Sequence, residues 1–219
     1  MCGIFCSFDA SKFKELARLN QIRGNHSYSI TEMGLSDFGI EIDLQHKEFG
    51  NFDPSFVMDV EKGESVYFVG HVQAPTTAIR SLDSVHPAEN EYGELLWHNG
   101  IIKATDISRL QKKHHSFNQW DTRLLLDELS SINMVDNLSE VDGSFACIYF
   151  DGHGLFVFTN ELCQLFVDES CNISSLQFPG STRLPAGQIF EIDFRSKKMV
   201  AVESWTFLTK NLPYYFGAT

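Results

Sequence analysis

The feature that most constrains this sequence is a cysteine at position 2, at the head of the short apolar stretch 1–8 (MCGIFCSF). The stretch is too short for a secretory signal peptide and is typical of a buried strand. If the initiator methionine is removed, Cys2 carries both a thiol and a free α-amine, whose ordinary pKa is near ~8. A nucleophile and a base then lie on one residue. Taken alone, the same residues fit equally well a strand that simply begins at a small residue.

Length and composition exclude several classes of protein. With 219 residues, 43% apolar and 21% charged, the chain is predicted to be a soluble globular protein of one domain, with two small domains as the alternative. No run approaches the roughly 18 apolar residues of a membrane span, so we expect a cytoplasmic location. A net charge of −12 without a basic stripe argues against nucleic-acid binding. The one dense basic spot, 112–115 (KKHH), is predicted to be a solvated helix end.

Hydrophobic periodicity predicts a strand-rich chain with three helices. The expected helices are 11–19 with Ser11 as N-cap, 105–115 with Thr105 as N-cap, and 121–132. The expected strands are a hairpin of 28–33 and 35–44 closed around Gly34, the buried run 66–72, strand 94–98 ended by Asn99-Gly100, a hairpin of 144–150 and 154–158, and short strands near Leu165, Ile173, Ile189 and Val200. Residues 45–64 are predicted to be a loop, and 73–91 to be irregular. This pattern suits two antiparallel sheets stacked face to face, with helices outside.

Eight short motifs follow one another along nearly the whole chain. They are 2–4 (CGI), 23–27 (RGNHS), 70–76 (GHVQAPT), 86–87 (HP), 97–102 (WHNGII), 121–122 (DT), 141–146 (VDGSFA) and 184–187 (LPAG). Together and in this order they resemble the glutaminase domain of class II glutamine amidotransferases, the N-terminal-nucleophile family of asparagine synthetase and glucosamine-6-phosphate synthase. The resemblance implies an α+β fold, the four-layer αββα N-terminal-nucleophile hydrolase sandwich of two antiparallel sheets with outer helices. It also implies a single glutaminase-type domain over 1–219, without a separate synthetase or acceptor domain.

The resemblance implies catalytic roles for three residues. Cys2 attacks the side-chain amide carbon of glutamine, aided by its own α-amine, and forms a γ-glutamyl thioester while ammonia leaves. Water then releases glutamate. The side-chain amide of Asn99 and the backbone N–H of Gly100 stabilise the oxyanion, and the loss of one such donor costs on the order of 3–4 kcal/mol. The structural alternative for Asn99-Gly100 is a plain hairpin turn.

Four further residues are implied in substrate binding. Asp121 takes the α-ammonium group, unless it is only a helix N-cap. Thr76 donates to the α-carboxylate, unless it is only solvated in a loop. Gln73 stands where the family has the arginine that clamps that carboxylate. Because an amide brings no charge, we expect glutamine binding to weaken about tenfold. Arg23 and Arg80 are the candidates to replace the clamp.

Other positions also depart from the family pattern. His26 replaces an aspartate, Thr159 an arginine, and Ala74 a tryptophan found in some members. The other four cysteines, Cys6, Cys147, Cys163 and Cys171, are predicted to be reduced and structural. Paired C-x₂-C spacings and a glycine-rich phosphate cradle are missing, so neither a metal nor a cofactor is expected.

Three hypotheses about function stay open at this stage. The first is a glutaminase that passes ammonia to a separate partner subunit, because the chain holds neither an acceptor domain nor an ATP motif. The second is an N-terminal-cysteine hydrolase of another small amide, which Gln73 favours. The third is a catalytically idle binding or regulatory subunit, favoured by His26, Thr159 and a retained Met1, which would block the α-amine. The aromatic tail 205–216 either packs on its own core or offers anchors to a partner.

Overall fold

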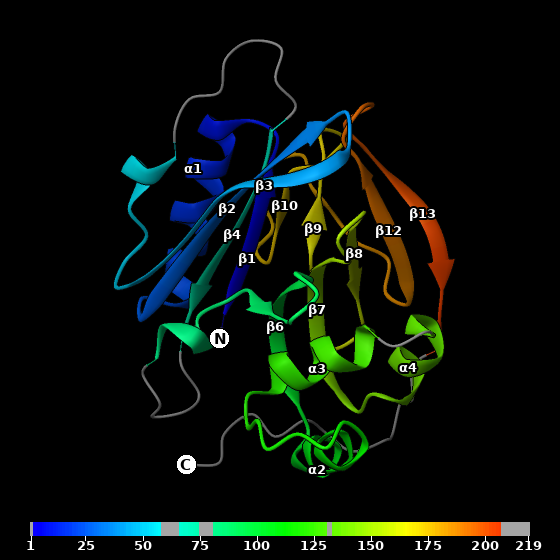
Figure 1. Ribbon diagram of the computed structural model, residues 1–219. Coiled ribbons are helices and arrows are strands. Elements are labelled where there is room, and N and C mark those ends of the chain that lie inside the picture. Colours follow the sequence, from blue (N-terminus) through cyan, green and yellow to red (C-terminus); the bar gives the residue numbers. More distant parts are fainter. Residues whose placement is uncertain (1, 58–65, 75–80, 131–132, 207–219) are drawn as a thin grey trace.

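Two antiparallel sheets form the centre of the molecule. The computed structural model describes residues 2–57, 66–74, 81–130 and 133–206 (Figure 1). The first sheet has the order β11 (Thr182–Arg183), β9 (Phe166–Val167), β10 (Ile173–Ser174), β1 (Gly3–Ser7), β4 (Val66–Gln73), β2 (Ser27–Ser36) and β3 (Gly39–Phe49). The second has the order β13 (Lys198–Ser204), β12 (Gln188–Asp193), β8 (Leu155–Thr159), β7 (Gly143–Phe150), β6 (Leu95–Ile102) and β5 (Ala88–Glu89).

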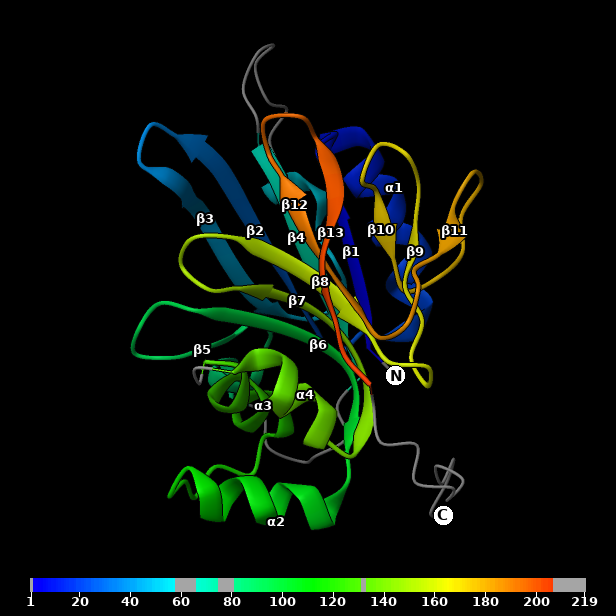
Figure 2. The ribbon, with the colours of Figure 1, turned by 90° about the vertical axis from the view of Figure 1, so that its right-hand side faces the viewer.

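Helices cover the outer face of each sheet. Helix α1 (Ala10–Asn20) packs on the first sheet, through contacts with β1 and β4. On the second sheet α3 (Asp121–Leu129) lies against β6, and α2 (Ala104–Lys113) and α4 (Met134–Glu140) pack on α3. Figure 2 shows the three later helices together on the side of the second sheet that faces away from β1. The predicted four-layer αββα sandwich is therefore confirmed.

Strand β1 shows how the sequence pattern builds these layers. All five of its residues are buried. Ile4 and Cys6 point into the core between the sheets, whereas Phe5 points into the core beneath α1. This alternation follows from the two-residue period of a strand, and it requires apolar residues at every position when both faces are covered. The strand pairs with β10 on one side and with β4 on the other.

Two turn predictions were wrong because strand pairing overrode local sequence. Gly34 lies inside β2, where a Cβ atom would come 2.5 Å from Asp43 Oδ2 of the paired strand β3. The turn comes later, at Asp37 and Phe38, and β3 continues to Phe49 into the predicted loop. Asn99-Gly100 does not end its strand either, because both residues pair with β7.

The helix predictions hold in position and fail in detail. Asp9, not Ser11, caps α1 by accepting a hydrogen bond from the Lys12 amide. Helix α2 begins at Ala104 and has no side-chain cap from Thr105. Helix α3 ends at Leu129, and the sequence pattern missed the seven-residue α4 that follows. The hairpin of β7 and β8 and the buried strand β4 were predicted correctly.

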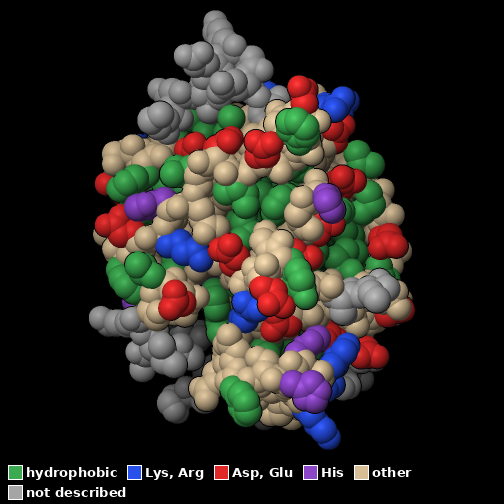
Figure 3. All heavy atoms as spheres, in the orientation of Figure 1, with side chains coloured by type: hydrophobic (Ala, Val, Ile, Leu, Met, Phe, Trp, Pro, Cys, Tyr) green, Lys and Arg blue, Asp and Glu red, His purple; other side chains and the backbone are tan. Residues whose placement is uncertain are grey.

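The distribution of charged side chains on the surface agrees with the net negative charge of the chain. The face in Figure 3 carries scattered acidic side chains among fewer lysines and arginines. Among the described residues, no helix is both long and apolar enough to cross a membrane.

The aromatic core beneath α1 gives a first stability prediction. The Phe13 side chain is fully buried, with its ring centroid 5.0 Å from that of Phe5 and 5.3 Å from that of Phe68. Replacement by alanine leaves a cavity, so we expect Phe13→Ala to lower the free energy of unfolding by about 3–5 kcal/mol in urea titrations. Phe117→Ala is the matched control, because that ring is 98% exposed and its loss should change stability by less than about 0.5 kcal/mol. Equal losses for the two variants would contradict the burial of Phe13.

Candidate active site

Four of the predicted site residues line one pocket. Cys2, Gln73, Gly100 and Asp121 surround a cavity of about 470 Å³, which lies in the size range of small-molecule sites. They come from the residue just before β1, from strands β4 and β6, and from the start of α3. Segments far apart in the sequence therefore meet at one end of the sandwich, where β1 and β6 come into contact.

Cys2 lies just before the first residue of β1 and is half-buried. Its Sγ is 3.8 Å from the carbonyl oxygen of Ala74. Burial raises the pKa of the Cys2 thiol above its ordinary value, the nearby Asp121 carboxylate raises it further, and Ala74 and Arg23 offset only part of the shift. The thiol is therefore protonated at neutral pH. As a nucleophile it would need a base to take its proton.

Arg23 and Asn99 both hold the backbone of Cys2. Arg23 Nε donates to the Cys2 carbonyl oxygen at 2.6 Å. The side-chain amide of Asn99 is oriented so that both of its ends form hydrogen bonds. Its nitrogen donates to the Cys2 carbonyl oxygen at 3.0 Å, and its oxygen accepts from Arg23 Nη2 at 3.3 Å. Arg23, predicted to bind substrate, is thus engaged behind Cys2 and does not line the described part of the pocket.

Gly100 is at a position where only glycine fits. Its φ is +154°, and a Cβ atom would lie 1.9 Å from the Ser144 carbonyl oxygen and 2.8 Å from His98 Nε2. The backbone of β6 can therefore approach β7 and the His98 ring closely. Gly100 lines the pocket together with Cys2.

Gln73 uses both ends of its side-chain amide within the protein. Its nitrogen donates to the Ser84 carbonyl oxygen at 3.3 Å, and its oxygen accepts from Ser27 Oγ at 3.1 Å. Its backbone carbonyl accepts from the His26 amide at 3.0 Å, so the 23–27 and 70–76 motifs pack together. His26 lines the pocket as well, but its ring nitrogen Nε2 is buried and has no hydrogen-bond partner among the residues that the structure describes.

Asp121 is the first residue of α3, and its carboxylate joins that helix to β6. One oxygen accepts from the Thr122 amide at 2.9 Å and the other from the Ile102 amide of β6 at 3.3 Å. The alternative role as N-cap was wrong, because Trp120 occupies the cap position. The other two predicted residues, Thr76 and Arg80, lie outside the described residues.

Sequence reasoning missed a cluster of buried histidines at the pocket, two of which, His86 and His98, line it. His71, His86 and His98 are each at most 3% exposed, and the rings of His71 and His86 stack with centroids 3.8 Å apart. Burial lowers the pKa of His71 to about 3 and also lowers the pKa values of His86 and His98. All three are therefore neutral at pH 7. Each lies in a quoted motif, but only the fold brings them together.

The remaining cysteines include one that touches the site. Cys6 is buried in the core between the two sheets, and Cys147 in the core between the second sheet and its helices, as predicted. Cys163 is half-buried, and its Sγ donates to the Asn99 carbonyl oxygen at 3.3 Å. In the described parts of the chain, no group of three or more His, Cys, Asp or Glu side chains is arranged to hold a metal ion.

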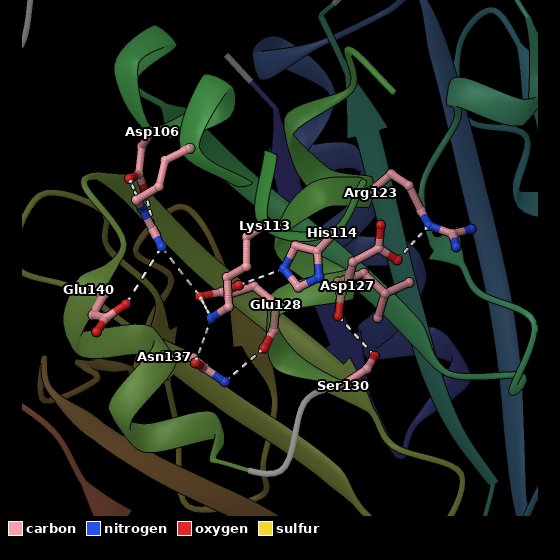
Figure 4. A network of polar contacts seen from close by, with 11 residues as sticks. Asp106, Lys113, His114, Arg123, Asp127, Glu128, Ser130, Asn137 and Glu140 are labelled. Carbon is pink, nitrogen blue, oxygen red and sulfur yellow. Dashed lines mark hydrogen bonds and ion pairs between the residues drawn. The ribbon is translucent and has the colours of Figure 1, made fainter. Parts of the chain in front are cut away.

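One wall of the pocket depends on a buried carboxylate. Ile107 of α2 lines the pocket, and α2 is tied to α3 through the fully buried Glu128 (Figure 4). Glu128 accepts from Lys113 Nζ at 2.9 Å and lies 2.6 Å from His114 Nε2. Residues 112–115 form the exposed end of α2 as predicted, except that His114 is half-buried where it contacts Glu128. A buried carboxylate attracts cationic groups because it is costly to bury unpaired.

The hydrogen bond from Arg23 to the Cys2 carbonyl oxygen can be tested directly. We expect Arg23→Ala to leave the Cys2 carbonyl without its charged donor and to lower the free energy of unfolding by about 1–3 kcal/mol. Because the lost cation also lowers the pKa of the Cys2 thiol, we expect alkylation of Cys2 by iodoacetamide to slow. Peptide mass mapping reports the alkylation of each cysteine separately. Arg18→Ala, which removes an exposed arginine of α1, is the control and should change neither quantity. Identical behaviour of the two variants would contradict the assigned contact.

Comparison with known proteins supports the fold. Neither a scan against protein-family models nor a search of curated proteins finds a match. Among solved structures, the chain is similar to the glutamine phosphoribosylpyrophosphate amidotransferase of B. subtilis, with a TM-score of 0.68 and 19% identity. It is also similar to a structure described as the allosteric regulatory enzyme of purine biosynthesis, with a TM-score of 0.62 and 18% identity.

Both alignments have the same extent. Each covers 94% of this chain and 49% of the other, so the chain spans about half the length of these solved structures. At such low identity the likeness concerns the fold, which agrees with the resemblance seen in the sequence motifs. The chain has the fold of the class II glutamine amidotransferases, the N-terminal-nucleophile sandwich.

Proposed function

We propose that the chain is a glutaminase that hydrolyses the side-chain amide of glutamine through a thioester on Cys2 and passes ammonia to a separate protein. The observation that carries this proposal is the shared pocket, which Cys2, Gly100 and Asp121 line together, with the Asn99 amide nitrogen 3.0 Å from the Cys2 carbonyl oxygen. Similarity to about half of an amidotransferase chain supports it. The ammonia-accepting partner and the cytoplasmic location stay predictions from the sequence.

The first half of the proposed reaction uses both ends of Cys2. After removal of Met1, the α-amine takes the proton of the thiol, which burial otherwise keeps protonated. The sulfur attacks the amide carbon of glutamine, and the C–N bond breaks as the α-ammonium group returns the proton to the leaving nitrogen. The products are the γ-glutamyl thioester and ammonia.

The second half is hydrolysis of the thioester. The α-amine accepts a proton from water, the resulting hydroxide attacks the thioester carbon, and glutamate leaves as the thiol is restored. Both tetrahedral intermediates carry an oxyanion, for which the Gly100 N–H and the Asn99 amide are the proposed donors. The Asn99 amide donates to the Cys2 carbonyl, so in this proposal it turns toward the oxyanion during the reaction. Asp121 accepts the substrate's α-ammonium group.

Glutamate release from glutamine tests the proposal. In protein whose intact mass shows a free N-terminal Cys2, we expect Cys2→Ala to lower the rate on the order of 10³-fold or more, because the nucleophile is lost. Hydroxylamine should intercept the thioester as γ-glutamyl hydroxamate in the parent but not in Cys2→Ala.

Cys171→Ala is the control for that experiment. Its thiol is buried elsewhere, beside the Lys197 carbonyl, and its removal should leave the rate unchanged. Glutamate release by Cys2→Ala at the parent rate would disprove the catalytic assignment. A parent protein with free Cys2 and no glutaminase activity would disprove the proposed reaction.

One observation favours a second candidate, the hydrolysis of a different small amide. A free α-carboxylate needs a donor, yet the Gln73 amide is already bonded to Ser27 and Ser84. Among the described residues that line the pocket, the charged side chains other than histidine are Asp83 and Asp121, both acidic. This environment suits an amide without a free carboxylate better than glutamine itself.

The variant Gln73→Arg separates the two candidates. If glutamine is the substrate, a cation at position 73 adds a charge-assisted bond to its carboxylate and should lower KM about tenfold with little change in kcat. Gln73→Met, which has a similar length but no donor, is the matched control and should not lower KM. An unchanged or raised KM in Gln73→Arg, together with faster turnover of an amide that lacks the carboxylate, would favour the second candidate.

A further inference from the structure

Thr122, the second residue of α3, links two buried histidines that no step of the proposed reaction uses. Its Oγ1 lies 3.1 Å from His86 Nε2 and 3.2 Å from His98 Nδ1. The three side chains are between 1% and 3% exposed, so these contacts are shielded from water. All three residues line the pocket.

Elementary chemistry fixes the direction of each hydrogen bond in this cluster. His98 Nε2 lies 3.4 Å from the Ser144 carbonyl oxygen, which can only accept, so this nitrogen carries a hydrogen. A neutral ring has one such hydrogen, so His98 Nδ1 is an acceptor. The single hydroxyl hydrogen of Thr122 therefore goes to His98. The Thr122 oxygen in turn accepts from His86 Nε2.

Two further observations support this assignment. Burial lowers the pKa values of His86 and His98, so both rings are neutral at pH 7, although the Asp121 carboxylate opposes the shift at His98. His71 obeys the same rule, because its Nε2 lies 3.2 Å from the His98 carbonyl oxygen and must donate to it. All three rings then carry their hydrogen on Nε2.

The chain of bonds runs from the loop before β5, through α3, to β6. Thr122 directly follows Asp121, whose carboxylate makes the other link to β6 through the Ile102 amide. The ring of His98 fills the space above Gly100, where a Cβ atom would come 2.8 Å from Nε2. Thr122 thus contacts β6 at His98, before Gly100, and Asp121 contacts it at Ile102, after Gly100.

We propose that Thr122 is a positioning residue: its hydroxyl completes a one-way hydrogen-bond chain from His86 to His98, which locks the first turn of α3 onto β6 and fixes the direction of the Asp121 carboxylate. The effect on substrate rests on the proposed function, in which Asp121 accepts an ammonium group. The hydrogen-bond chain itself does not depend on that function.

Nitrogen NMR of the full chain labelled with ¹⁵N-histidine tests the chain of bonds without any activity. We expect His71, His86 and His98 to show the neutral Nε2–H tautomer throughout pH 6–8. Thr122→Val should shift the ring nitrogens of His86 and His98, and Thr122→Ser, which keeps the hydroxyl, should not. A charged ring or an Nδ1–H tautomer at His98 in the parent protein would overturn the proposal even if Thr122→Val failed to fold.

Steady-state kinetics test the consequence for Asp121. We expect Thr122→Val to raise KM for glutamine about five- to tenfold with a smaller change in kcat, and Thr122→Ser to restore both. For glutaramate, an amide that lacks the α-amine, Thr122→Val should leave KM unchanged. Equal losses on both substrates, or in both variants, would overturn the positioning role. Absence of any glutaminase activity in the parent would instead count against the proposed function and leave the NMR result standing.

Discussion

The burial of β1 on both faces is the constraint on which the site depends. Ile4 and Cys6 fill the core between the sheets, and Phe5 fills the core under α1. A shift of one residue would exchange these faces and place each side chain in the wrong layer, so the register of the strand is strongly specified. Gly3 adds to this, because a Cβ atom there would lie 3.0 Å from Asn20 Oδ1. Cys2 is therefore held in place, because it directly precedes a strand whose register is fixed.

The second sheet fixes the opposite side of the pocket by similar means. Gly100 pairs with Phe145 of β7, and the missing Cβ lets the two strands and the His98 ring close together. The contact between Cys2 and the Asn99 amide then joins one sheet to the other. The proposed catalytic groups are backbone atoms and short side chains. Such groups have little conformational freedom once the strands are packed, so the packing of the sheets fixes their positions.

Much of this arrangement could be predicted from the sequence, for two different reasons. Strands β1 and β4 were predicted because apolar residues on both faces leave a strong local pattern. The meeting of Cys2, Gln73, Gly100 and Asp121 was predicted because the motifs stand in the order of a known family, and no local rule would have found it. Pattern rules failed at Gly34 and at Asn99-Gly100, where glycine serves a close approach between neighbours rather than a turn.

The histidine cluster could not be predicted, and the reason is physical. His71, His86, His98 and Thr122 come from four separate segments, and whether each is a ligand, a base or a buried hydrogen-bonding group depends on packing that no local pattern encodes. Packing determines the role of each histidine because it excludes water. Burial keeps the rings neutral, and a neutral ring has one donor and one acceptor nitrogen, so each hydrogen bond has a defined direction.

The neutral histidines, the hydrogen bonds of the Gln73 amide to Ser27 and Ser84, and the contact of Arg23 with Cys2 have a common consequence for recognition. Each of these groups is of a kind that can bind a carboxylate, and each makes hydrogen bonds within the protein instead. The Asp121 carboxylate then becomes the main electrostatic determinant among the described residues that line the pocket, supported by Asp83. Selectivity at such a site would come from the positive end of a substrate and from its shape. Under the proposed function, the attachment of α3 to β6 therefore affects which amide Cys2 hydrolyses.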